Sequence, residues 1–242
     1  MIEIAIDGTA ASGKGTLGKK LSDKYSFPYL DTGLLYRKVA HELIKDNKVN
    51  TTELEQISCD FAMILNFKEL KNTNLRTEDV AKLASKIATF PDLRKILNNK
   101  QKEFNNSSKK KFGGCILDGR DIGTTILPNA DFKFFITASL EIRAKRRLLE
   151  KNISFLHEND EKCMLQALMN NMRERDRLDS NRKISPLVPA KDAYVIDTTS
   201  INPEELLLKV ADIIERKKWD AKKNGGFSKL NKQITYWKFI LL

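Results

Sequence analysis

The sequence predicts an α/β fold in which helices cover both faces of a parallel sheet. Short apolar segments alternate along the chain with longer segments of helical periodicity, which is the pattern of the strand–helix units that build such a sheet. A glycine-bearing loop follows the first apolar segment, as in folds that bind phosphate groups at the end of a strand. The composition, with 41% hydrophobic and 31% charged residues, is that of a globular chain.

The expected strands are short, mostly apolar runs bounded by polar or turn-forming residues. Such runs are typical of strands that are buried on both faces of a sheet. They are, in chain order, Ile2–Ile6, Phe27–Leu30, Cys115–Leu117, Phe132–Ile136 and Tyr194–Ile196.

The expected helices carry apolar residues at helical spacing, and several have start or stop signals. Thr77 can cap one helix, Pro91 marks its end, and Pro203 suits the first turn of the last helix. A basic loop is expected from Lys109 to Gly114, just before the third strand. The helices are, in order, Lys14–Tyr25, Thr32–Asp46, Thr52–Asn66, Thr77–Phe90, 92–106, Leu140–Lys151, Glu161–Leu178 and Pro203–Lys218.

The composition disfavours three classes of protein. No run approaches the ~18 apolar residues of a membrane-spanning helix, so no membrane span is expected. The first residues, MIEIAIDG, are acidic and strand-like, so no secretory signal is expected. The three cysteines, Cys59, Cys115 and Cys163, are scattered, which argues against a zinc site and favours a reducing, cytoplasmic location.

The net charge of +11 is unevenly distributed along the chain. Residues 216–242 carry eight basic side chains and one acid, a net charge of +7, which leaves only +4 of the +11 for residues 1–215. Because a nucleic-acid footprint usually lies on the folded domain, we expect no nucleic-acid partner. Three interpretations of the basic and apolar tail, 225–242, stay open. The tail packs on the body, it anchors the protein to a partner or an anionic membrane, or it is sequence without a function past the functional end.

The strongest motif is a phosphate-binding loop, in which Gly8 and Gly13 bracket four residues and Lys14 follows directly. Glycines let the backbone wrap so that consecutive N–H groups point at an anion, and the helix that begins near Lys14 adds its positive end. The lysine ammonium reaches the terminal phosphates of a nucleotide. The residues expected to bind the nucleotide are Gly8, Thr9, Ala10, Ala11, Ser12, Gly13, Lys14, Gly15 and Thr16.

One departure from the general motif narrows the class of nucleotide-binding protein to which this loop can belong. Gly15 stands where most such loops have the serine or threonine that meets Mg²⁺, and Thr16 follows it. The Gly-Lys-Gly-Thr ending is similar to that of the nucleoside monophosphate kinases. The sequence has no Asn/Thr-Lys-x-Asp motif, which disfavours a GTPase.

Four further segments extend this similarity along the chain. With the phosphate loop they span residues 2–215 in the right order, and together they resemble the bacterial-type cytidylate kinases, a nucleoside monophosphate kinase branch of the P-loop kinases. The segments are LDTGLLYR at 30–37, ASKIA at 84–88 with Phe90, Pro91 and Arg94, LDGRDIGT at 117–124, and RDRLDSNR at 175–182 leading into PLVPA at 186–190.

The resemblance implies a P-loop sheet with a helical acceptor-binding region and a mobile arginine-rich lid. The kinase domain would cover residues 1–224, with its core at 1–31, 107–156 and 184–218, its acceptor-binding region at 32–106 and its lid at 157–183. The implied activity is the phosphorylation of CMP and dCMP to CDP and dCDP in pyrimidine nucleotide metabolism. ATP is the implied phosphoryl donor, Mg²⁺ the cofactor, and a cytoplasmic monomer the implied form.

The resemblance also implies roles for individual residues. A guanidinium matches phosphate oxygens, a carboxylate can accept from the cytosine amino group but would repel the uracil oxygen there, and an acid at a strand end suits Mg²⁺. The implied catalytic residues are Lys14, Arg120, Arg175 and Arg182, and the implied metal ligands, directly or through water, are Thr16 and Asp118. The implied substrate contacts are Arg37 and Arg120 for the phosphate, Asp121, Arg94, Arg182 and Thr32 for the base, and Ser85, Arg175 and Asp179 for the sugar.

Two departures from the family and two basic clusters add further expectations. Thr32 stands where the family more often has serine, and the short polar stretch 66–77 predicts an abbreviated acceptor-domain insert. The arginines at 173, 175, 177 and 182 would repel one another unless an anion binds among them. Arg143 and Arg147 share a helix face that points either to the nucleotide phosphates or to solvent.

Two alternative functions follow from the same residues. The chain could be a kinase for another small acceptor, such as UMP, AMP or shikimate, although Asp121, Arg94 and Arg182 favour cytosine. It could also be a nucleotide-gated protein that binds nucleic acid through its tail, with retention that falls steeply with salt.

Overall fold

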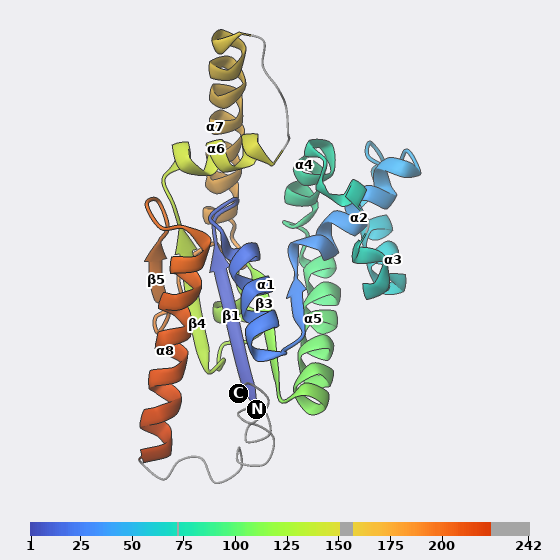
Figure 1. Ribbon diagram of the computed structural model, residues 1–242. Coiled ribbons are helices and arrows are strands. Elements are labelled where there is room, and N and C mark those ends of the chain that lie inside the picture. Colours follow the sequence, from blue (N-terminus) through green and yellow to red (C-terminus); the bar gives the residue numbers. More distant parts are fainter. Residues whose placement is uncertain (72, 151–156, 224–242) are drawn as a thin grey trace.

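The computed structural model describes residues 1–71, 73–150 and 157–223, so the tail at 225–242 lies outside the described residues. Its centre is a five-stranded parallel sheet, which confirms the predicted α/β fold (Figure 1). The strands are β1 (Ile2–Gly8), β2 (Tyr29–Asp31), β3 (Gly114–Gly119), β4 (Phe132–Thr137) and β5 (Tyr194–Asp197). In the order β2-β3-β1-β4-β5, β1 is the central strand.

The register of the sheet gathers the strand ends that carry polar residues. Asp7 of β1 is aligned with Gly119 of β3, and Asp31 of β2 is aligned with Asp118 of β3. All strands run the same way, so their carboxyl ends share one edge, where ligand crevices form in open α/β sheets. The loop after β1 and the side chain of Asp118 are therefore neighbours.

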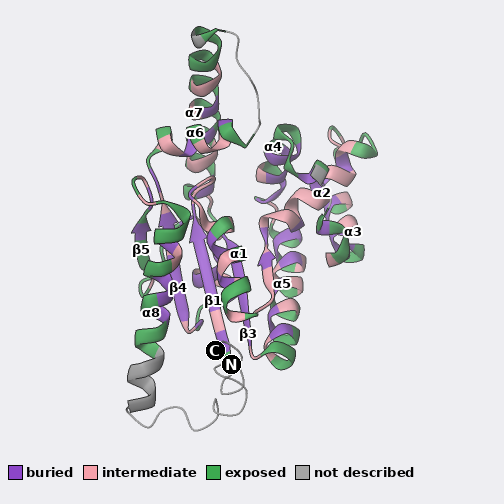
Figure 2. Cartoon of the chain, viewed as in Figure 1, coloured by how far each residue is buried: buried purple, intermediate pink, exposed green. Residues whose placement is uncertain are grey.

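Helices cover both faces of the sheet because β1 directs alternate side chains to opposite sides. Ile4 and Ile6 join an apolar cluster with α1 (Lys14–Tyr25) and α8 (Pro203–Lys223). Ala5, between them in the chain, belongs to the cluster of the opposite face. In Figure 2 the central strands β1 and β4 are coloured mostly as buried, as expected of a parallel sheet that is covered on both faces.

The predicted helices are present, with ends that differ by a few residues. Both predicted ends of α1 agree with the structure. Two short 3₁₀ helices and one π-helical turn were not predicted, because such single turns have no periodicity long enough to detect. The remaining α-helices are α2 (Gly33–Lys45), α3 (Leu54–Ile64), α4 (Glu78–Ile87), α5 (Pro91–Phe112), α6 (Leu140–Leu149) and α7 (Glu158–Ser180).

The prediction of a basic loop over 109–114 is wrong. α5 continues through its three lysines to Phe112, and β3 begins at Gly114. Asn105 and Ser108 continue the buried face of α5 toward its C-terminus. The three lysines lie in the last turn, where basic side chains stabilise a helix. Gly113, with φ of 78°, ends the helix in the left-handed conformation.

The helices between β2 and β3 form a region beside the sheet. Most of the described residues of the stretch 66–77 lie in η1 (Phe67–Lys71) and η2 (Thr73–Arg76), and the described part of this stretch contains no strand. One apolar cluster joins Leu35, Leu75 and Leu93 of this region to Leu117 of the sheet. The region is therefore anchored to the sheet through a shared core.

A helix pair completes the carboxyl edge of the sheet. α6 and α7 pack through Ala144, Leu148, Leu168 and Met172 and extend beyond the sheet (Figure 1). Among the described residues, no helix is long and apolar enough to cross a bilayer.

Candidate active site

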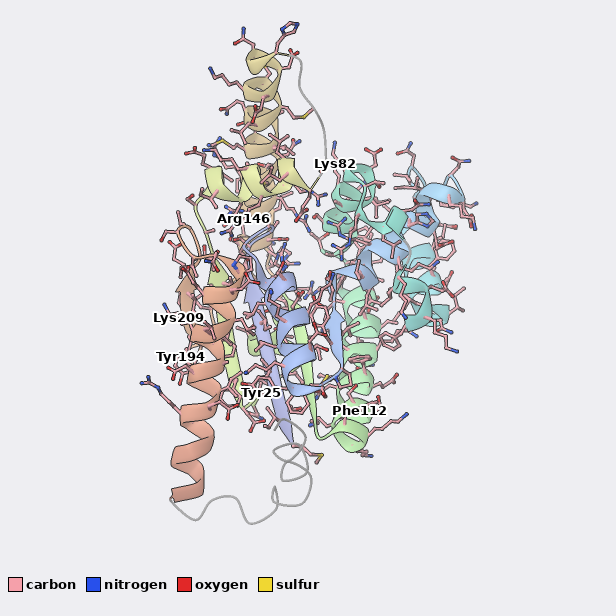
Figure 3. All side chains as sticks on the ribbon, in the orientation of Figure 1. Tyr25, Lys82, Phe112, Arg146, Tyr194 and Lys209 are labelled. Carbon is pink, nitrogen blue, oxygen red and sulfur yellow. The ribbon has the colours of Figure 1, made fainter. Side chains whose placement is uncertain are left out.

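A cavity of about 940 Å³ lies at the carboxyl edge of the sheet. Its walls come from the loop after β1, from the helices between β2 and β3, and from α6 and α7. Arg146 and Lys82, which Figure 3 labels, line it from opposite sides. The predicted site residues that line it are Ala10, Ala11, Ser12, Gly13, Lys14, Gly15, Thr16, Thr32, Arg37, Ser85, Arg94, Asp118, Arg120, Asp121, Arg175, Asp179 and Arg182; the predicted Gly8 and Thr9 do not line it.

The loop after β1 is shaped by backbone conformations that few residues adopt. Gly8 has φ of +148°, and a Cβ there would lie 2.0 Å from the carbonyl oxygen of Ile136 on β4. Gly13, with φ of +95°, opens α1, and between them Ala11 has φ of 56°. Positive φ at a non-glycine residue is uncommon and costs free energy. Gly8 thus shapes the loop from beneath without touching the cavity.

Lys14 and Asp118 face each other across the start of α1. Lys14 Nζ lies 4.0 Å from Asp118 Oδ1, and both side chains are largely buried. Burial lowers the pKa of Lys14, against the influence of Asp118, and burial raises the pKa of Asp118 to about 6, against the influence of Lys14. The two groups are beyond hydrogen-bond distance, so each keeps capacity for a bound phosphate or cation.

The residues around Asp118 fit a magnesium ion. Tyr29 donates its hydroxyl to Asp118 Oδ2 at 2.6 Å, while the buried Oδ1 has no hydrogen-bond partner among the described residues. Thr16 is exposed at the cavity. The described part of the chain holds no cluster of three metal-ligating side chains, but Mg²⁺ usually takes only one or two carboxylates besides water and substrate phosphates. Sequence reasoning missed Tyr29, because only the β2–β3 pairing brings it here.

Two of the four residues predicted to contact the base form a buried ion pair. Arg94 Nη2 lies 2.5 Å from Asp121 Oδ2, and Arg94 Nη1 donates to the carbonyl oxygen of Ala88 at 3.1 Å. The guanidinium also lies over the ring of Tyr36, 5.7 Å from its centroid. These contacts fix the Asp121 carboxylate at the cavity wall while leaving it lone pairs for a ligand.

A second ion pair joins the end of β3 to α7. Arg120 Nε donates to Asp179 Oδ2 at 2.8 Å, and Arg182 Nε donates to the backbone oxygen of Asp179 at 3.3 Å. Burial would raise the pKa of Asp179, but Arg120, Arg175 and Arg182 lower it further, so the net shift is downward. Asp179 is therefore an ionised acceptor that holds the arginines around it.

Arg37 and Arg175 are among the arginines at the cavity that lack such a partner within the described residues. Arg37 donates to the backbone oxygen of Leu75 at 3.0 Å, and neither Arg37 nor Arg175 forms an ion pair with a described residue. Burial, and then the neighbouring Arg175, lowers the pKa of Arg37 to about 10; burial, and then Arg120, lowers that of Arg175 to about 10. Guanidinium groups crowded in this way favour the binding of an anion between them.

The two predicted hydroxyl contacts are bonded to the backbone. Thr32 Oγ1 donates to the carbonyl oxygen of Asp118 at 2.7 Å, and Ser85 Oγ donates to that of Ala81 at 3.1 Å. Both residues line the cavity, and each hydroxyl oxygen can still accept a hydrogen bond from a ligand.

The hypothesis that four clustered arginines share an anion is wrong for two of them. Arg175 and Arg182 line the cavity, whereas Arg173 and Arg177 are exposed on the other side of α7 and do not. Arg177 pairs with Glu174 at 2.7 Å, three residues earlier on the same helix. Arg173 and Arg177, four residues apart, share one face of α7, and Arg175, two residues from each, lies on a different face.

The basic set on α6 also divides. Arg146 and Arg147 line the cavity; Arg146 Nη2 donates to the backbone oxygen of Thr198 at 2.6 Å. Arg143 instead pairs with Asp176 of α7 at 2.8 Å and donates to the backbone oxygen of Ala10 at 3.4 Å. Arg143 and Arg147 lie one turn apart on α6 but contact different groups: Arg147 lines the cavity, and Arg143 supports the loop after β1 through Ala10.

Comparison with known proteins gives one consistent family. A sequence model of the family described as "Cytidylate kinase" matches residues 4–216. A cytidylate kinase of Methylocella silvestris is 42% identical over 212 residues, which cover 88% of this chain and 93% of that protein. Cytidylate kinases of Paramagnetospirillum magneticum and Bartonella tribocorum are 40% and 42% identical, over 89% and 83% of this chain and 98% and 88% of theirs.

Proposed function

The chain belongs to the cytidylate kinase family and catalyses the ATP-dependent phosphorylation of CMP and dCMP to CDP and dCDP, and we propose how the residues of its cavity divide that work. The observation that carries the proposal is the composition of the cavity wall. The loop after β1 lies on one side, the buried Arg94–Asp121 pair lies on the other, and arginines line the space between them.

On the donor side, the backbone of residues 8–16 wraps the ATP phosphates and Lys14 contacts the terminal ones. The positive φ values of Ala11 and Gly13 support this, because residues in the left-handed region let neighbouring backbone N–H groups converge on one anion. The position of Lys14 at the start of α1, where the helix dipole is also positive, supports it further.

On the acceptor side, Arg37 and Arg120 hold the phosphate of CMP. Arg120, Arg175, Arg182 and Lys14 neutralise the charge that spreads over the transferring phosphoryl group. The lowered pKa values of Arg37 and Arg175 support this assignment, because a bound phosphate relieves the repulsion that causes part of each shift.

Asp121 reads the cytosine by accepting a hydrogen bond from its amino group. Uracil presents a carbonyl oxygen at that position, which a carboxylate repels. The contact with Arg94 supports the role, because it holds the Asp121 carboxylate at the cavity wall, where its oxygens can accept a hydrogen bond from a ligand. Arg182 and Thr32 complete the base contacts, and Ser85, Arg175 and Asp179 contact the sugar.

This arrangement needs no general base. The phosphate of CMP has a second pKa of about 6, so near neutral pH its attacking oxygen is already deprotonated. What the chain supplies is in-line placement of the two nucleotides and a cationic wall around the transferred group. Asp118 and Thr16 would hold Mg²⁺, which supplies charge neutralisation at the ATP phosphates when it is bound.

A coupled assay with ATP and five acceptors tests this division. CMP and dCMP should support ADP release, and AMP, UMP and shikimate should do so at least about tenfold less efficiently, as expected for a lost base contact. Equal efficiency with UMP would contradict the role given to Asp121. Turnover that is independent of any free monophosphate would contradict the acceptor side altogether.

The proposal extends to the domain organisation, the oligomeric state and the location of the protein. It includes the domain boundaries given above, closure of residues 157–183 as a lid, a monomeric state and a cytoplasmic location. The three cysteines support a reducing compartment, because Cys59, Cys115 and Cys163 are all free thiols. Analytical ultracentrifugation of the full chain tests the monomer, and a sedimentation coefficient of a dimer would contradict it.

A further inference from the structure

Asp7 is a buried carboxylate with none of the roles proposed above. It is the penultimate residue of β1, directly before Gly8. Its Oδ1 and Oδ2 accept hydrogen bonds from the backbone N–H groups of Ile122 and Gly123, each at 2.7 Å. Within the described ranges no ion pair neutralises Asp7, so these two bonds are its strongest contacts.

The two N–H groups open the π-helical turn η3 (Ile122–Ile126), which follows Asp121. The first N–H groups of a helix have no partner within it, and the side chain of the preceding residue usually accepts one. That residue is Asp121, whose backbone oxygen accepts from Thr125 at 2.8 Å but whose carboxylate makes no capping bond. Asp7 caps η3 in its place.

Because Asp7 and not Asp121 caps η3, the Asp121 carboxylate is oriented differently at the cavity. Aspartate is among the most favourable N-capping residues, so Asp121 would ordinarily turn back toward the N–H of Gly123. Because Asp7 already occupies that N–H, the carboxylate of Asp121 points instead to Arg94, 2.5 Å away, and to the cavity.

We propose that Asp7 is a positioning residue for acceptor recognition: by capping η3 from β1, it keeps the carboxylate of Asp121 free to face Arg94 and the cytosine. This inference rests on the proposed function of Asp121. It also gives the donor loop and the base-reading turn one shared anchor, because Asp7 immediately precedes Gly8.

Asp7→Asn tests the proposal with almost no change of shape. The amide keeps one acceptor oxygen and turns its own N–H₂ toward the second backbone N–H, so one bond is lost. We expect the CMP/UMP ratio of kcat/KM to fall about tenfold, mainly through a higher KM for CMP, with the KM for ATP changed less than about twofold.

Asp131→Asn is the matched control. Asp131 Oδ2 accepts from the backbone N–H of Glu3 at 2.7 Å, at the opposite end of β1 and away from the cavity. It loses the same kind of bond and should leave the ratio unchanged. A ratio that falls equally in both variants would overturn the proposal.

Variants of Asp121 separate the two ideas. In the Asp121→Ala background, Asp7→Asn should change the CMP/UMP ratio less than about twofold, because no carboxylate remains to be positioned. If Asp121→Ala alone leaves the ratio unchanged, the proposed function of Asp121 fails. If Asp121→Ala lowers the ratio and Asp7→Asn does not, only the inference about Asp7 fails.

Circular dichroism and thermal unfolding establish that each variant is folded. Should Asp7→Asn not fold, Asp7→Ser takes its place, because its hydroxyl oxygen can still accept one N–H. A lower unfolding temperature with an unchanged CMP/UMP ratio, or equal rises in the KM for ATP and CMP, would mean that Asp7 is merely structural and would overturn the proposal.

Discussion

The donor and acceptor sides of the cavity are built by different means. The donor side is one continuous stretch, Gly8–Thr16, whose proposed anion-binding groups are backbone N–H groups and a single ammonium. The acceptor side takes side chains from α2, α4, α5, the end of β3 and α7, which are far apart in the sequence. A site of the first kind depends on local backbone conformation, and one of the second kind depends on tertiary packing.

The two sides also differ in how their charges are partnered. Lys14 and Asp118 stand 4.0 Å apart, whereas Arg94–Asp121 and Arg120–Asp179 are in contact at 2.5 and 2.8 Å. Breaking a buried ion pair leaves a charge uncompensated, which is strongly destabilising. Substitutions on the donor side should therefore act by changing the loop geometry or by removing a single charge. Substitutions on the acceptor side should act by leaving the other member of a buried ion pair without its partner.

The largest effect is expected from Gly8→Ala. The new Cβ would lie 2.0 Å from the Ile136 carbonyl oxygen, and the positive φ adds strain of about 1–3 kcal/mol. Since β1 and β4 pair at this point, the variant should unfold at least about 10 °C lower than the wild type or fail to accumulate. Thermal unfolding measures this.

Gly113→Ala is the control for backbone strain alone. Gly113 also has positive φ, 78°, but nothing lies within 4 Å of a Cβ there. Its free energy of unfolding should fall only by the cost of the backbone strain, and the protein should remain folded. If both variants unfold at the same temperature, the close approach of β4 to Gly8 does not shape the loop.

Lys14→Ala should come next, with the fold intact. Removal of one charge that stabilises the transition state costs about 100- to 1,000-fold in kcat. Lys20→Ala is the matched control, because Lys20 lies on the same helix but pairs with Glu204 away from the loop, at 2.6 Å. Retention of more than about a tenth of the wild-type kcat in Lys14→Ala would contradict its placement.

On the acceptor side, Asp121→Ala should reduce discrimination and stability together. The CMP/UMP ratio of kcat/KM should fall by a factor that corresponds to about 1–3 kcal/mol of discrimination. This loss should exceed the loss in kcat for CMP. The protein should also be less stable, because Arg94 keeps a buried charge without its partner.

A double-mutant cycle with Arg94→Ala checks the pairing. The double variant should lose less stability than the sum of the single variants, because it leaves no unpaired charge. Urea unfolding measures all three, and strictly additive losses would mean that the two side chains do not act as a pair.

The smallest effect is expected from truncation after Asn224. All the proposed site residues lie at or before Arg182, whereas the tail at 225–242 lies outside the described residues. The kcat and the KM for ATP and CMP should stay within about threefold, or about 0.65 kcal/mol. A tenfold loss in a truncated protein that is still folded by circular dichroism would make the tail part of the active enzyme.

Prediction from the sequence succeeded where the pattern was local. All five strands and both ends of α1 follow from apolar runs and turn residues that lie within a few positions of each other. It failed at Lys109–Phe112, where three lysines suggested a loop although the buried face of α5 extends the helix. It also failed for Arg173 and Arg177, because their number suggested a common anion while the helix turns them outward.

By itself the sequence determined the shape of the loop proposed to bind the donor, because Gly8 and Gly13 set the conformation of one continuous stretch, and backbone conformation is a local property. Only the tertiary structure decided the rest of the chemistry. Tyr29 reaches Asp118 through strand pairing, and Asp7 caps a turn more than one hundred residues away. Such contacts between distant residues follow from sheet register and helix packing, which no short spacing in the chain encodes.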